Sequence, residues 1–190
     1  MLNRGNGLVG LIGFLILICT TNTDAAEPEQ IHLATTGENS EMVIQWGTEE
    51  DTATFCNSDN TVEYGTNPDS LNFSEEGSDD MYLWTTCTHT VILSELSSNT
   101  TYYYRVGGDG EWSNVFSFMT MEENPESIQI GAIADHGISS NAQETTSNMV
   151  PVDFDLVIHA GDISYANGAG SGNGIGDQSV WDEYQNQIET

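Results

Sequence analysis

Residues 96–107 read Leu-Ser-Ser-Asn-Thr-Thr-Tyr-Tyr-Tyr-Arg-Val-Gly, and this stretch decides the fold. Tyr102, Tyr104 and Val106 alternate with Tyr103 and Arg105, as expected for a strand with one apolar face. The turn before the strand brings a leucine, a threonine and a tyrosine to the corner between two sheets. We therefore predict a sandwich corner in which the hydroxyl of Tyr102 bonds to the backbone upstream.

The chain on both sides of this corner has the same rhythm of short strands and turns. Met42, Ile44 and Trp46 place large apolar groups on one face of a strand. Further strands are expected at residues 61–65, 88–93 and 115–118, and no helical period competes with them. The pattern resembles a fibronectin type III-like sandwich, although Ser98 stands where that family often has proline. We predict an all-β sandwich over residues 27–121 with Trp46 in its core.

A polar connector at residues 121–126 separates the sandwich from a region with another rhythm. Two apolar stretches, residues 128–133 and 154–160, flank a polar stretch over residues 139–148 that is predicted to be helical. This order favours a parallel α/β sheet covered on both faces. Asp135 and Asp162 follow the two apolar strands, so they would share the carboxyl edge where such sheets bind ligands.

Two carboxylates at one sheet edge repel each other unless a cation lies between them. Carboxylate oxygens suit hard metals such as Fe(III), Mn and Mg, and a phenolate from Tyr165 would favour a trivalent ion over Zn(II). Gly137 and Gly161 allow the backbone to turn sharply beside this site. The competing interpretation is that Asp135 and Asp162 cap the helices that follow them.

The residues around these aspartates resemble the motifs of purple acid phosphatases. Gly161-Asp162-Ile163-Ser164-Tyr165 is similar to their Gly-Asp-x-x-Tyr block, and Asp135-His136-Gly137 to most of Gly-Asp-x-Gly. Ala134 replaces the first glycine, and His136 occupies the variable position, which favours a structural role or one outside the ligand set. The resemblance implies an acid phosphatase with an αββα metallophosphatase-like catalytic domain, which would start at residues 127–190.

In that family a dinuclear metal centre hydrolyses phosphomonoesters. The resemblance implies that Asp135 and Tyr165 bind Fe(III) and that Asp162 bridges to a second divalent metal, which is Fe, Zn or Mn. The family's later ligands, in a Gly-Asn-His-Glu block and two histidine blocks, do not occur within these 190 residues. We therefore expect the polypeptide alone to be inactive. The alternative is a non-catalytic secreted binding or adhesion module built on the sandwich.

Charge and the amino-terminal segment indicate the compartment. With 30 acidic residues, two basic residues and a net charge of −28, the chain is not expected to bind nucleic acid. Residues 1–26 combine Arg4 with an apolar run over residues 8–19 and small residues at 25–26. A cleaved signal peptide is predicted, with an uncleaved anchor as the alternative. The mature protein is expected outside the cell and off the membrane; no oligomeric state or substrate preference follows.

Two further features, a pair of sequons and a pair of cysteines, fit export. Asn72 and Asn99 begin sequons for N-glycosylation. Cys56 and Cys87 are the cysteines left after cleavage; they could form a disulfide or stay as two buried thiols. The glycine-rich stretch at 168–176 is predicted to be a surface loop, because a phosphate-binding Walker loop needs a lysine and the chain has none.

Overall fold

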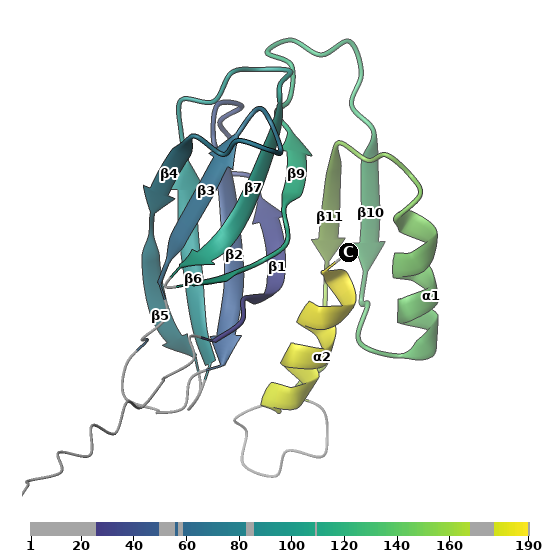
Figure 1. The fold of residues 1–190 in the computed structure, drawn as a ribbon. Helices are drawn as coiled ribbons and strands as arrows, with labels where there is room; N and C mark the ends of the chain where they lie inside the picture. Colours follow the sequence, from purple (N-terminus) through teal and green to yellow (C-terminus); the bar gives the residue numbers. More distant parts are fainter. Residues whose placement is uncertain are drawn as a thin grey trace, which may run out of the picture.

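The computed structural model describes residues 26–49, 56, 59–82, 86–108, 110–167 and 177–189. Residues 1–25 of the predicted signal peptide and the glycine-rich stretch 168–176 lie outside the described residues. The elements are β1 (Glu29–Ala34), β2 (Met42–Glu49), β3 (Thr61–Gly65), β4 (Phe73–Glu76), β5 (Ser78–Tyr82), β6 (Thr86–Leu93), β7 (Thr101–Gly108), β8 (Glu111–Trp112), β9 (Phe116–Met119), β10 (Ile130–Ala134), α1 (Ser140–Met149), β11 (Leu156–Ala160) and α2 (Gln178–Ile188). Strands dominate the fold (Figure 1).

Strands β1 to β9 form two antiparallel sheets that face each other (Figure 1). One sheet has the order β1-β2-β6-β5, and the other has the order β4-β3-β7-β8 with β9 also paired to β7. The apolar side chains of the two sheets meet in one core. Its buried members are Ile31, Ile44, Trp46, Val62, Tyr64, Val91, Leu93, Leu96, Tyr102, Tyr104, Val106 and Phe118. The predicted sandwich is confirmed.

The strand alternation read from the sequence sets which side chains are buried. Ile44 and Trp46 are at most 1% exposed, and Tyr102, Tyr104 and Val106 fill the core from β7. The hydroxyl of Tyr102 accepts a hydrogen bond from the backbone N–H of Ser97 at 3.0 Å. The predicted corner is therefore present, with its aromatic ring in the core and its oxygen paired to the turn.

Residues 130–160 form a separate strand–helix–strand unit. β10 and β11 pair in parallel, in register from Ile130 opposite Leu156 to Ala134 opposite Ala160. Between them, α1 begins after Ser139, whose side chain accepts from the N–H of Ala142. Helix α2 contacts both α1 and strand β1, so it lies between this unit and the sandwich (Figure 1).

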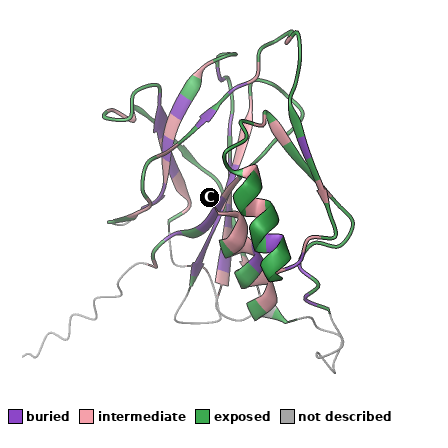
Figure 2. Cartoon of the chain, turned by 90° about the vertical axis from the view of Figure 1, so that its right-hand side faces the viewer, coloured by how far each residue is buried: buried purple, intermediate pink, exposed green. Residues whose placement is uncertain are grey.

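The expected cover on both faces of the parallel strands is not found in the part of the chain that is described. Ile130, Val157 and Ile158 on β10 and β11 are each about half exposed. Within the described residues, α1 and α2 are the helices that lie beside these strands, and most residues of α1 are themselves exposed (Figure 2). Within the described residues, no helix is long and apolar enough to cross a membrane.

Candidate metal centre

Asp135 and Asp162 meet at the carboxyl edge of the parallel strands. Asp135 directly follows β10, and its N–H donates to the carbonyl of Ala160 at the end of β11 (3.1 Å). The backbone N–H of Asp162 in turn donates to Oδ1 of Asp135 at 3.2 Å. The parallel register therefore brings together two carboxylates that are 27 residues apart in the chain.

The two loops that carry these aspartates are joined by their backbones. The N–H of His136 donates to the carbonyl of Asp162 at 3.2 Å, and that of Gly137 donates to Ile163 at 2.7 Å. Asp135 and Tyr165 have positive φ angles of 50° and 59°, a conformation that residues other than glycine seldom adopt. Such conformations persist where the surrounding structure holds them, and they gather at functional sites.

Glycine is required at position 161 for two reasons. Its φ angle is 73°, and an added Cβ would lie 2.7 Å from Oδ1 of Asp135. Any side chain here would therefore push the Asp135 carboxylate out of place. Gly137 also has a positive φ angle, and a Cβ there would lie 3.1 Å from the Tyr165 ring.

Tyr165 completes the set of oxygen donors. Its side chain is half exposed. Loss of solvation is the first cause that raises the pKa of the Tyr165 phenol, followed by the negative charges of Asp135 and Asp162 and by a polar interaction with the Asp135 side chain. Without a cation the phenol therefore keeps its proton. A metal ion at this edge would reverse the balance and release that proton.

This donor set suits a hard cation, because its donor atoms are the oxygens of two carboxyl groups and one phenol. The described residues contain no group of three His, Cys, Asp or Glu side chains that could hold a metal. A metal bound here would therefore depend on the phenol as well as the two carboxylates. Asp135, Asp162 and Tyr165, the three residues predicted from the sequence, would supply part of the ligand set of one metal ion.

Comparison with known proteins shows which family the sandwich resembles. Residues 28–120 match the family model described as the purple acid phosphatase N-terminal domain. The sandwich is a purple acid phosphatase N-terminal domain. The predicted resemblance to this family is thereby confirmed, and it also has support from the rest of the chain.

Relatives of the purple acid phosphatase family extend across both regions. Probable purple acid phosphatase 20 from Arabidopsis thaliana is 27% identical over 80% of this chain and 35% of its own length. Acid phosphatase type 7 from Danio rerio is 23% identical over 91% of this chain and 39% of its own length. The structure of a purple acid phosphatase from yellow lupin (Lupinus luteus) seeds shares the fold, with a TM-score of 0.70 at 21% identity. The structural match covers 86% of the present chain and 33% of the lupin protein. The present chain thus spans between about a third and two fifths of the length of these relatives.

Several contacts near Asp135 and Asp162 were not predicted. His136, beside Asp135, lies within hydrogen-bond distance of Thr146 on α1 and Gln187 on α2. His159 on β11 pairs its Nδ1 with the hydroxyl of Tyr184 on α2 at 2.8 Å. Sequence reasoning missed these partners because they are up to 51 residues from the histidine that they contact.

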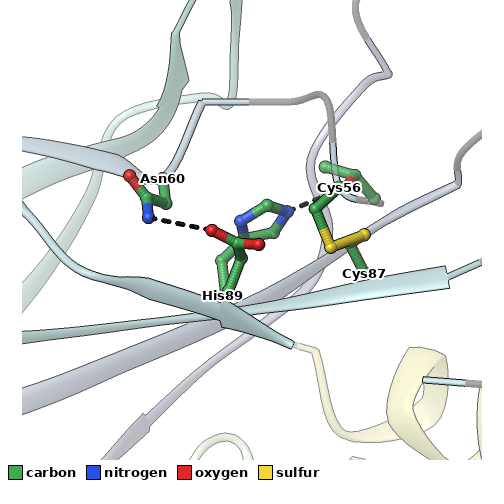
Figure 3. Close-up of a disulfide and its surroundings, with 6 residues drawn as sticks. Cys56, Asn60, Cys87 and His89 are labelled. Atoms are coloured by element: carbon green, nitrogen blue, oxygen red, sulfur yellow. Dashed lines mark hydrogen bonds between the residues drawn. A yellow bond between two sulfur atoms is a disulfide. The ribbon is translucent and has the colours of Figure 1, made fainter. Parts of the chain in front are cut away.

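The structure places the remaining predicted sites on the sandwich. Cys56 and Cys87 form a disulfide beside the buried His89 (Figure 3). Asn72 and Asn99 are both exposed, so each sequon is accessible to a glycosyltransferase. The Asn99 amide donates to Glu122 at 3.2 Å, whereas Oδ1 of Asn72 accepts from the Ser70 hydroxyl at 3.0 Å.

Proposed function

We propose that this chain belongs to a secreted, metal-dependent acid phosphatase that hydrolyses phosphomonoesters. One observation carries the proposal: Asp135, Asp162 and the Tyr165 hydroxyl converge at the carboxyl edge of parallel strands, next to a sandwich of the purple acid phosphatase family. Residues 127–190 would then be the first part of a metallophosphatase catalytic domain.

The donor chemistry assigns a role to each residue. Asp135 and Tyr165 would hold Fe(III), and Asp162 would bridge to a second metal, which is Fe, Zn or Mn. Bound cations lower the pKa of water and neutralise charge on the phosphoryl group. Tyr165 must lose its proton to bind, so metal affinity should rise with pH. The backbone contacts between the two loops orient the carboxylates.

The first test is iron binding by the 190-residue chain. Fe(III) titration should produce a visible absorption band from charge transfer between phenolate and iron. Tyr165→Phe should abolish the band, because it removes the phenolate oxygen. Tyr103→Phe is the matched control, since this tyrosine lies on β7 in the sandwich. A band of unchanged intensity in the Tyr165→Phe variant would overturn the assignment.

The second test concerns turnover. These 190 residues provide three of the expected ligands, so we expect no release of phosphate from p-nitrophenyl phosphate. Sequencing the transcript beyond the codon for Thr190 distinguishes a phosphatase from a non-catalytic binding module. An in-frame Gly-Asn-His-Glu block with later histidine blocks would support the phosphatase. A stop codon, together with failure to bind iron, would favour a secreted binding or adhesion module.

The third test concerns secretion. Export is supported by the amino-terminal pattern, by the two exposed sequons and by the Cys56–Cys87 disulfide. Expression in eukaryotic cells should release a glycosylated protein whose electrophoretic mobility increases after enzymatic removal of N-glycans. Asn72→Gln and Asn99→Gln should each remove part of that shift. Retention of the full chain in the cell pellet with no glycan would contradict this part of the proposal.

A further inference from the structure

Three aromatic side chains pack together next to Asp135. They are His136 after β10, His159 on β11 and Tyr184 on α2. The centroids of the His136 and His159 rings are 5.8 Å apart, and His136 and Tyr184 meet edge to face at 6.0 Å. Tyr184 is only 5% exposed. This His136–His159–Tyr184 cluster therefore connects both parallel strands to α2.

The His136 ring is fixed by polar contacts from two helices. Its Nε2 lies 3.1 Å from the hydroxyl of Thr146 on α1. Its Nδ1 lies 3.0 Å from the carbonyl of Gly137 and 3.2 Å from the amide nitrogen of Gln187 on α2. With the hydrogen on Nδ1, the ring donates to Gly137 and accepts from Thr146. With the hydrogen on Nε2, it donates to Thr146 and accepts from Gln187, so either tautomer makes two hydrogen bonds.

This anchored ring belongs to the residue next to a candidate ligand. Asp135 has the positive φ angle, and the N–H groups of His136 and Gly137 make the backbone bonds to the Asp162 loop. A non-glycine residue keeps such a conformation only where its surroundings hold it. The ring of His136 is a side-chain anchor for this turn and joins it to both helices.

We propose that His136 is a positioning residue: its ring, held between α1 and α2, keeps the Asp135 carboxylate beside Asp162 and Tyr165. The metal part of this inference rests on the proposed function, whereas the positioning of the loop does not. Histidine at the end of a strand could otherwise serve only as general packing. Packing alone would stabilise the whole strand–helix–strand unit and would not act selectively on the ligand loops.

Amide hydrogen exchange followed by NMR separates these two roles without any metal. The reporters are the N–H groups of Asp162 and Gly137, which bond across the two loops. In His136→Ala we expect both to exchange about tenfold faster, while amides inside β10 and β11 change less than about twofold. His136→Gln should recover part of the protection, because its amide can replace ring contacts. Equal acceleration throughout the unit, or none at the two reporters, would overturn the proposal.

A pair of threonines supplies a conservative variant and its control. Thr146→Val removes the hydroxyl beside His136 and should accelerate the two reporter amides by a smaller factor. Thr145→Val removes the neighbouring hydroxyl, which donates to the carbonyl of Asn141 in the same helix, and should leave the two reporter amides unchanged. Equal effects from the two valines would mean that changes in the helix, and not the ring contact, move the loop.

Fe(III) titration of the same variants keeps the inference separate from the proposed function. His136→Ala should weaken iron binding about tenfold, as expected when a group supporting a ligand is lost, and Thr145→Val should not. If the wild-type chain binds no iron but the reporter amides still respond selectively, the metal assignment fails and the positioning stands. If iron binds equally well to wild type and His136→Ala, and the reporters do not respond, the positioning fails and the metal assignment stands.

Discussion

The sandwich and the strand–helix–strand unit hold their shapes by different means. The sandwich encloses a continuous core of aliphatic and aromatic side chains. Outside it, the buried hydrophobic side chains described are Ala142, Ala166 and Tyr184, and the apolar strands β10 and β11 stay half exposed. The candidate metal centre therefore depends on backbone bonds between loops and on polar contacts with helices. In this molecule stability is concentrated in one region and the candidate chemistry in the other.

The largest expected effect comes from emptying the sandwich core. Trp46 is 1% exposed and stacks on His89 with ring centroids 5.0 Å apart. Trp46→Ala should lower the free energy of unfolding by about 3–5 kcal/mol, because it leaves a large cavity. Trp181→Ala on the half-buried face of α2 is the matched change in the other region and should cost clearly less. Urea denaturation followed by circular dichroism measures both, and equal losses would remove the contrast.

The next effect comes from the disulfide, which constrains only the sandwich (Figure 3). Cys56→Ala removes the bond and leaves the buried Cys87 in place. Since the bond closes a loop with a sequence separation of 31, its loss should cost about 2–4 kcal/mol. Hydrogen exchange should quicken in the sandwich strands and stay the same in β10 and β11. Dithiothreitol should destabilise the wild type but add nothing to Cys56→Ala; a further loss there would show another cause.

Removing the hydroxyl of Tyr102 at the sandwich corner should lower the free energy of unfolding by a smaller amount. Tyr102→Phe deletes the oxygen that accepts from the Ser97 N–H and should cost about 1–2 kcal/mol. Tyr103→Phe, on the other face of the same strand, should change the free energy of unfolding by less than about 0.5 kcal/mol. Thermal melts of the two variants make the comparison. A Tyr102→Phe variant as stable as Tyr103→Phe would show that the corner bond is not needed.

The two regions also differ in how far their structure could be predicted. Strand alternation at Ile44 and Trp46 and the corner at Tyr102 indicated the sandwich, because burial follows the period of two. Strand β4 was missed because all its side chains are exposed, so no apolar alternation marks it. Apolar strands followed by Asp135 and Asp162 indicated a shared edge, since parallel strands end on one side.

What the sequence could not show about the candidate site is long-range or conformational. The contact of His136 with Gln187 spans 51 positions, and no local pattern pairs a variable motif residue with a distant helix. The positive φ angle of Asp135 is equally hidden, because glycine is the usual sign of that conformation and aspartate is not. The prediction that both faces of the parallel strands are covered was wrong for the described residues. An apolar run shows that a strand can be buried, but it does not show which elements pack on it.

The smallest expected effect tests where the two regions meet. Glu29 on β1 lies near α2, and the pKa of its carboxyl is raised by partial burial and then by the charges of Glu49, Asp182, Glu189 and Glu27. A raised pKa means that the folded chain holds this proton more tightly than the unfolded chain. The favourable contribution is therefore complete below the unfolded value of 4.5 and is lost as the pH rises through the higher folded-state value.

Glu29→Gln removes the charge that is unfavourable at neutral pH. It should raise the free energy of unfolding at pH 7 by less than about 1 kcal/mol, because solvent screens so exposed a group, and the gain should fade below pH 4.5. Glu38→Gln, in the exposed turn after β1, is the matched control and should show no such gain. Urea denaturation at pH 7 and below pH 4.5 measures the free energy of unfolding of the two variants. Asp182 and Glu189 contribute from α2 and its C-cap. Identical behaviour of the two variants would mean that burial and these neighbouring charges do not raise the pKa of Glu29.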